Sequence, residues 1–349
     1  MLTSVRVITI QKQIHYVKHK DLGFEKEQLL LVNTPDYFNN HEALKTELLK
    51  NPNIESLSFT RGGPGKIFMG MGSGENDNYF DINCISVDTS FLKTFNIKLL
   101  FGREFLPSDF DQACIMNKTA YEKFGWKDLN DKRYMNGRTG GFEVVGVADD
   151  FHIASLYEKI EPVCLIYDVK ETSFINLKLI GNNLGSTMDY IESTWNEISG
   201  NMPFEYKFYD TLFDSMYKKE ENLARNVNLF AFVALVLTVL GIFGQIFHLS
   251  IMKTKEIGIR KVNGARVLEI LAMLNNDFFK WVAIAFLFGT PMAWYIMKLW
   301  LNGFAYRTTL DWWIFALAGS IVLGVAMLTI SWQSWWAARR NPVEALKYE

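Results

Sequence analysis

The chain changes character near residue 225. Charged residues are spread throughout the part before it, as in a water-soluble domain, whereas three later stretches carry almost none. Residues 226–252 and 312–338 each run for 27 residues without a formal charge, and residues 281–297 add 17 more between Lys280 and Lys298. A bilayer core of roughly 30 Å needs about 20 apolar residues of helix. The pattern therefore predicts three membrane-spanning helices, at about residues 227–250, 279–299 and 312–336.

The part before the first span shows the shorter periodicities of a mixed α/β domain. Strands are predicted at five runs rich in β-branched or aromatic residues, namely 28–32, 81–87, 142–147, 163–167 and 174–179. Helices are predicted at residues 40–50, 117–124 and 186–199, and the Gly-rich residues 61–74 are expected to form a long loop. The expected fold class is an α+β extracytoplasmic domain, residues 22–220, joined to an α-helical transmembrane bundle of three helices, residues 221–349.

Lysine and arginine are distributed unevenly around the predicted spans. The loop after the first span and the C-terminal tail are rich in them, with Lys253, Lys255, Arg260, Lys261, Arg266, Lys280, Arg339, Arg340 and Lys347. The short loop between the second and third spans holds only Lys298 and Arg307. The positive-inside rule then places the first loop and the tail in the cytoplasm and residues 22–220 on the far side. Residues 1–21 contain no complete span, so we expect export of the outer domain to depend on an upstream membrane segment.

Composition and motifs give little support to catalysis. The net charge of -2 provides no electrostatic reason for a nucleic-acid partner, and the three cysteines lack the C-x-x-C spacing of a zinc site. Residues 62–66 contain a Gly-rich run ending in Lys66, but Thr60 and Ile67 occupy positions where a phosphate-binding loop needs Gly and Ser or Thr. Asp149, Asp150 and His152 could form a metal or acid/base set, but the favoured interpretation is that the strand ending at Val147 turns through Asp149 and Asp150, which cap the segment that follows. The sequence therefore predicts no catalytic, cofactor-binding or metal site.

The segment after the first span combines charge with apolar side chains. Glu256 and Arg260 stand four residues apart, the spacing of an ion pair on one helix face. Asn263 and Gly264 form a helix stop signal, since Gly adopts the left-handed conformation freely after a helix. Such a short amphipathic helix either lies on lipid headgroups or docks on a protein partner, and the pattern alone leaves both readings open.

The sequence of this segment adds a family resemblance. Residues 253–265, KTKEIGIRKVNGA, resemble the signature that follows the second transmembrane helix of FtsX-like and MacB-like ABC transporter permeases. The tail AARRNPVEAL at residues 337–346 is similar to the same family, as are FGREF at residues 101–105 and VVGVADDFH at residues 144–152. Residues 5–20 resemble the outer continuation of the family's first helix.

The resemblance implies a MacB-like periplasmic core and a chain that is not itself an enzyme. It implies docking to a separate ABC ATPase subunit, which binds the ATP, while this chain binds no cofactor. The implied coupling residues are Glu256, Ile257, Gly258, Ile259, Arg260, Lys261, Gly264 and Ala265, with a tail motif at Asn341, Pro342, Val343 and Leu346.

Further partners implied are membrane lipid and a second permease half or an identical copy, in a multi-pass protein of the bacterial inner membrane. The resemblance also implies mechanical transmission, in which ATP binding on the partner rearranges the extracytoplasmic domains. A membrane receptor or sensor whose outer domain binds a ligand is the alternative, and it also needs a signalling partner.

Overall fold

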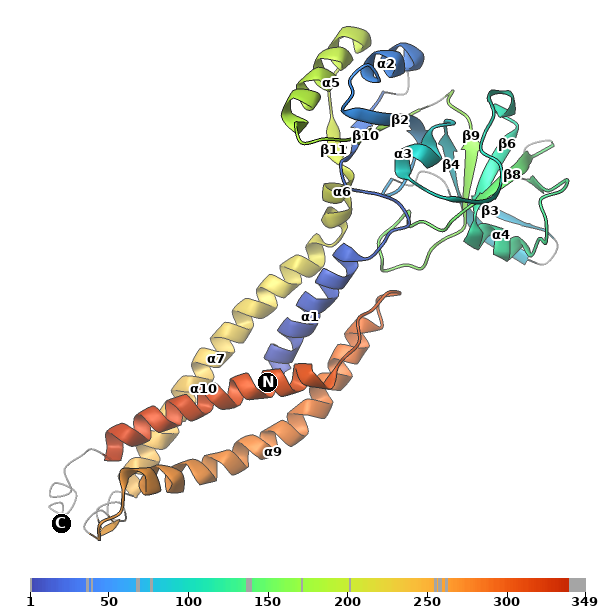
Figure 1. The fold of residues 1–349 in the computed structure, drawn as a ribbon. Coiled ribbons are helices and arrows are strands. Elements are labelled where there is room, and N and C mark those ends of the chain that lie inside the picture. The colour runs from blue at the N-terminus through green and yellow to red at the C-terminus, as the bar shows by residue number, and fades with distance from the viewer. Residues whose placement is uncertain are drawn as a thin grey trace. The chain divides into compact units, whose positions relative to one another are not determined.

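The structure is a computed structural model that describes residues 2–338, except 36–37, 39, 67–69, 76–77, 136–139, 171, 201, 254–255, 257–258 and 261–262. It divides into two compact units (Figure 1). The outer unit consists of His19–Tyr217 together with Phe304–Tyr306, and the membrane unit consists of Met1–Lys18, Lys218–Gly303 and Arg307–Glu349. Each unit is described by itself below.

The outer unit is built on one mixed sheet. Its strands, in the part of the chain that the structure describes, are β1 Leu29–Asn33, β2 Ile54–Arg61, β3 Gly70–Glu75, β4 Asn78–Val87, β5 Leu99–Gly102, β6 Ala113–Asn117, β7 Arg133–Tyr134, β8 Phe142–Ala148, β9 Val163–Tyr167, β10 Phe174–Leu179 and β11 Tyr206–Phe208. They follow the order β11-β1-β10-β2-β4-β9-β6-β8-β5, while β3 pairs with β4 and β7 with β8. β4 and β9 run parallel, as do β6 and β8, and the other pairs are antiparallel.

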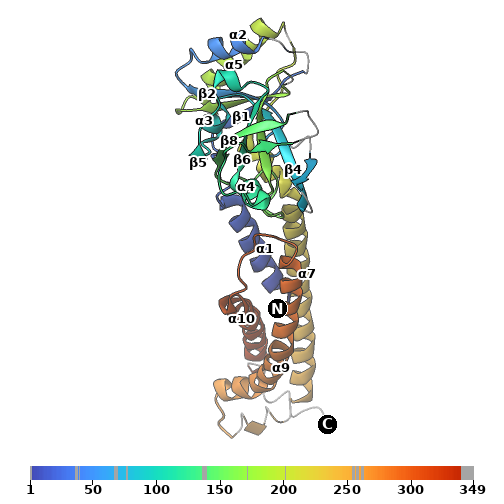
Figure 2. The ribbon, with the colours of Figure 1, turned by 90° about the vertical axis from the view of Figure 1, so that its right-hand side faces the viewer.

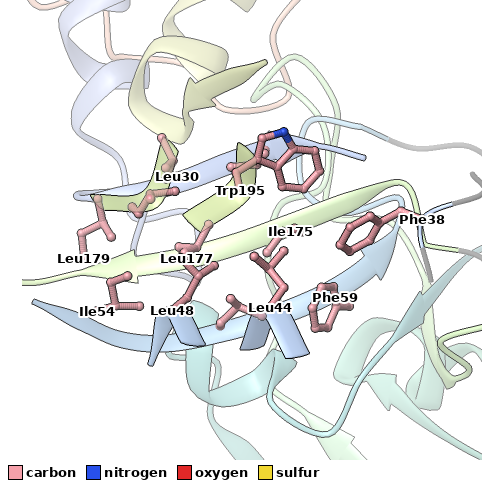
Figure 3. Close-up of a cluster of buried hydrophobic side chains, with 13 residues drawn as sticks. Leu30, Phe38, Leu44, Leu48, Ile54, Phe59, Ile175, Leu177, Leu179 and Trp195 are labelled. Carbon is pink, nitrogen blue, oxygen red and sulfur yellow. The ribbon is translucent and has the colours of Figure 1, made fainter. Parts of the chain in front are cut away.

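Helices α2 His41–Leu48 and α5 Leu184–Ser199 pack together over one end of this sheet. Apolar residues at helical spacing on α5 face strands β1, β2 and β10, and Trp195, 1% exposed, lies at the centre of their core (Figure 3). Its indole stacks on Phe38 with ring centroids 5.3 Å apart, and its Nε1 donates a hydrogen bond to the Met202 carbonyl. The buried indole therefore has both its apolar and its polar contacts satisfied.

A second core lies at the other end of the sheet, under α4 Lys118–Phe124. The side chains of Cys84, Cys114 and Cys164 belong to this layer, and Cys84 lies directly opposite Cys164 on the parallel strands β4 and β9. All three are free thiols packed among apolar side chains. The remaining helices of the outer unit are α3 Phe91–Phe95, the 3-10 turn Pro107–Asp109 and α6 Tyr209–Met216.

The membrane unit contains α1 Leu2–His19, α7 Lys218–Met252, α9 Val267–Leu301 and α10 Trp312–Ala338. Among the described residues, three helical segments are long and apolar enough to cross a membrane: Lys218–Gln245, Ala283–Leu301 and Trp312–Thr329. α10 packs against α7 and α9. The Phe286 ring of α9 packs directly against the α10 backbone at Gly319, where an added Cβ would lie 2.2 Å from the ring. α1 joins their core through Val5 and Ile10, and Lys12 forms an ion pair of 2.7 Å with Asp311.

The predicted α+β domain with a three-helix membrane part is confirmed. Each of the five predicted strands and three predicted helices is present, with ends shifted by a few residues. The prediction of a long loop over residues 61–74 is wrong, because Gly70–Glu75 form β3 in a hairpin with β4. Gly70, Gly72 and Gly74 favour a loop by their local preference, but backbone pairing with β4 holds this segment in an extended strand.

Candidate functional site

The segment between α7 and α9 contains the predicted coupling residues. Of these, the structure describes Glu256, Ile259, Arg260, Gly264 and Ala265. Glu256, Ile259 and Arg260 are helical, and the Arg260 guanidinium lies 3.0 Å from the Glu256 carboxylate, as the spacing of four residues predicts. Ile257, Gly258, Lys261 and the tail residues Asn341, Pro342, Val343 and Leu346 lie outside the described residues.

The predicted stop at Gly264 is confirmed by the backbone. Gly264 has φ +86°, the left-handed conformation that glycine adopts without strain. The Ala265 amide donates a hydrogen bond of 3.0 Å to the Arg260 carbonyl, and the Asn263 amide donates one of 3.1 Å to the Ile259 carbonyl. The bond from Ala265 is the 6→1 bond of a Schellman motif, which satisfies a carbonyl group at the end of a helix, and the bond from Asn263 is an ordinary bond of the helix itself. α9 then begins at Val267, with the Glu269 carboxylate accepting a hydrogen bond from the Arg266 amide.

The side chains of this segment are open to contact. Glu256 and Arg260 expose 45% and 54% of their side chains, and Ile259 is 51% exposed beside them. An ion pair this exposed contributes at most about 1 kcal/mol to stability. Ile259 and the ion pair beside it are therefore accessible to a protein partner or to lipid headgroups.

The helix that leads to this segment begins earlier than the sequence predicted. The first span was predicted at residues 227–250, but α7 starts at Lys218 and runs without a break to Met252 (Figure 2). Its first residues are charged, so a search for apolar runs does not include them. The available signal was the absence of Gly and Pro from residue 218 to residue 240, which lets a helix continue.

The polar residues that suggested catalysis have structural roles. Asp150 accepts hydrogen bonds from the Thr119 amide at 2.8 Å and the Thr119 hydroxyl at 2.9 Å. It thus caps α4, which precedes it in the sequence, rather than the segment that follows it as expected. His152 is buried, and desolvation followed by the charge of Lys20 lowers its pKa to about 4. Within the described ranges, no group of three His, Cys, Asp or Glu residues could hold a metal ion.

The run that resembled a phosphate loop is a tight turn. The Gly63 amide and the Lys66 amide each donate a hydrogen bond of 2.9 Å to the other residue's carbonyl. The Gly65 amide donates to the Ile153 carbonyl at 2.7 Å. Because these amides are paired within the protein, they do not form the ring of free donors that holds a phosphate.

Comparison with known proteins identifies the membrane part. Residues 228–343 match the family described as FtsX-like permease C-terminal, and the match includes the coupling segment. No curated protein matches the chain. Among solved structures, the periplasmic region of MacB from Actinobacillus actinomycetemcomitans is 13% identical, covering 57% of this chain and 97% of its own length, with a TM-score of 0.41. The extracellular domain of the noncanonic ABC-type transporter YknZ from Gram-positive bacteria is 16% identical, covering 51% of this chain and 97% of its own, with a TM-score of 0.37.

Proposed function

Because residues 228–343 match the FtsX-like permease C-terminal family, we propose that the chain is the permease subunit of an ABC transporter. A separate nucleotide-binding subunit binds and hydrolyses ATP, and this chain turns the movement of that subunit into a conformational change of its extracytoplasmic domain. The chain is a multi-pass protein of the inner membrane, with the outer unit on the extracytoplasmic side. It works beside a second permease half or a second copy of itself.

The observation that carries this proposal is the segment at residues 256–265, in which the described side chains Glu256, Ile259 and Arg260 are exposed. It lies between two membrane-crossing helices, in the loop that the positive-inside rule assigns to the cytoplasm. Its length is fixed by the Gly264 stop, and its surface offers Ile259 as an apolar anchor between Glu256 and Arg260. These features favour docking on a protein over lying flat on lipid headgroups, where a continuous apolar face is expected.

The length of α7 supports mechanical transmission. A helix of 35 residues measures about 52 Å at 1.5 Å per residue, well beyond the roughly 30 Å of a bilayer core. It begins at the residue after Tyr217, the last residue of the outer unit's main segment, and ends just before the coupling segment. Since α7 contains no Pro, it has no proline kink between its two ends.

Reversing the charge of the coupling segment tests the proposal. The double variant R260E/K261E places acidic side chains where basic ones faced the ATPase, and a like-charge clash at an interface costs several kcal/mol. We expect copurification of the ABC ATPase subunit with the tagged chain, and stimulation of its ATP hydrolysis, to fall at least tenfold. Protease protection should show normal membrane insertion.

A matched control lies at the start of α7, the helix that leads to the coupling segment. Lys218 and Lys219 are adjacent and exposed, so K218E/K219E makes the same change of charge in α7 away from the coupling segment. This control should copurify the ATPase as well as the parent chain does. Undiminished copurification and ATPase stimulation with R260E/K261E would refute ATPase docking and favour the receptor reading or a segment lying on lipid.

A further inference from the structure

One loop of the outer unit contacts every chain segment that enters this unit. The loop comprises residues 152–157, which follow β8 and the motif at residues 144–152. The chain enters the outer unit after α1, leaves it before α7, and returns to it at Phe304–Tyr306, between α9 and α10. All the contacts described below are made inside the outer unit.

The first entry is held by backbone contact. The His152 amide donates a hydrogen bond of 2.8 Å to the Leu22 carbonyl. Gly23, with φ +78°, sits so close that an added Cβ would lie 2.2 Å from the Asp150 carbonyl oxygen. Only glycine permits this approach, so the segment after α1 is fixed against the start of the loop.

The exit before α7 is held by Tyr217. The Leu156 amide donates a hydrogen bond of 2.8 Å to the Tyr217 hydroxyl, and Leu156 itself is fully buried. The rings of Tyr157 and Tyr217 lie nearly parallel, with centroids 6.4 Å apart. Tyr217, which immediately precedes α7, is therefore bound to the loop through both its hydroxyl and its ring.

The third entry forms a short strap across the same loop. The Ala305 amide donates to the Tyr157 carbonyl at 3.0 Å and the Tyr306 amide to the Leu156 carbonyl at 3.4 Å. The Phe304 ring, 5% exposed, stacks on Tyr157 with centroids 4.2 Å apart. The Tyr306 ring and the His152 imidazole are nearly perpendicular, with centroids 5.1 Å apart. The Lys20 ammonium lies over the Tyr306 ring, 4.4 Å from its centroid.

The loop is in turn fixed to the body of the outer unit. Phe151 and Ile153 are 0% and 2% exposed, and the Gly65 amide binds the Ile153 carbonyl. The loop is therefore packed between the unit's core and the three entering segments.

We propose that residues 152–157 are the junction through which the outer unit is held to, and moved by, all three segments that connect it to the membrane helices. Tyr157 is the central positioning residue, because it binds Tyr217 and Phe304 through its ring and Ala305 through its carbonyl. The transmission part of this inference rests on the proposed function. The contacts themselves are independent of it.

Hydrogen exchange of the full chain in lipid nanodiscs tests the contacts without any ATPase. The Ala305 and Tyr306 amides should be protected in the parent chain, and Y157A or F304A should raise their exchange about tenfold, the effect of losing one buried aromatic stack. The Y157A/F304A double variant should exchange no faster than the faster single variant, because both substitutions remove the same contact. Unprotected amides in the parent chain, or fully additive effects, would overturn the junction.

The control is a second stack of the same kind in the same unit. Phe124 and Trp126 stack with centroids 4.4 Å apart near α4, so F124A should leave exchange at Ala305 unchanged. With the ABC ATPase bound, adding ATP should change exchange in the outer unit of the parent chain and of F124A, but not of Y157A, whose copurification and ATP hydrolysis persist. An ATP response that survives in Y157A overturns the inference, whereas failure of the parent chain to bind the ATPase counts against the proposed function.

Discussion

Acidification should destabilise the outer unit through His152. His152 is 4% exposed, and its imidazole and the Tyr306 ring are nearly perpendicular, with centroids 5.1 Å apart. Desolvation and then Lys20 lower its pKa to about 4, while Asp150 and Asp21 oppose the shift. The perturbation we choose is H152F, which keeps an aromatic ring in the same place and removes the titrating group.

The direction and size of the stability change follow from the pKa of His152 in the folded and unfolded chain. An unfolded histidine has a pKa near 6.5, so between about pH 6.5 and pH 4 the unfolded chain binds a proton that the folded chain does not. The free energy of unfolding therefore falls as the pH drops through this window and levels off below about pH 4. From pH 7 to pH 4.5, this one group should lower the stability by about 2 kcal/mol.

Hydrogen exchange at the core strands β8 and β10 reports the free energy of opening in the full chain. After correction for the intrinsic pH dependence of exchange, the parent chain should lose about 2 kcal/mol more than H152F between pH 7 and pH 4.5. Other titrating groups, including His41, whose pKa is also lowered by burial, contribute equally to both proteins. An identical pH dependence of the two proteins would refute the reasoning, because it would mean that His152 has the same pKa in the folded and the unfolded chain.

Two further substitutions test the packing of each unit. W195A removes a buried indole from the core beneath α2 and α5 and should destabilise the outer unit by about 3–5 kcal/mol, measured as a fall in the urea midpoint. W195F keeps an aromatic ring there, so it should lose clearly less stability. Equal losses of stability in the two variants would contradict the packing. G319A places a Cβ against the Phe286 ring and should lower the thermal midpoint of the detergent-solubilised chain, whereas G324A in the same helix, where an added Cβ has no neighbour within 4 Å, should not; equal effects would argue against close packing of α9 and α10.

The sequence predicted the elements whose side-chain pattern matches their surroundings. β9, VCLIY, is a continuous run of apolar residues and β10, FINLKL, is apolar at four of its six positions, and their predicted bounds agree with the structure. β2, Ile54–Arg61, was missed because its Ser58 and Thr60 look like loop residues but are buried. Ser58 donates a hydrogen bond to Asp88, and Thr60 accepts one from Asn176, both far away in the sequence. A strand of this kind forms because residues far away in the sequence bind its polar side chains, and the local sequence pattern does not show those partners.

In the candidate site as well, the features that depend on neighbouring residues were predicted and those that depend on distant residues were not. The ion pair of Glu256 with Arg260 and the stop at Gly264 depend on neighbours within five residues, so spacing alone predicted them. The junction at residues 152–157 was not predicted, because it joins Tyr157 to Tyr217 and Phe304, which are 60 and 147 positions away. The motif at residues 144–152 marked the strand that leads into the loop, but gave no sign of what the loop binds.

Site-specific photocrosslinking from Ile259 tests the central claim most directly. A photoreactive amino acid replaces Ile259 in the coupling segment, and in a control replaces Leu237, which is 62% exposed on the membrane-crossing part of α7. Illumination of cells that express the chain with its ABC ATPase should give a covalent adduct with the ATPase from position 259 and none from position 237. Adducts from position 259 with lipid alone would contradict the account.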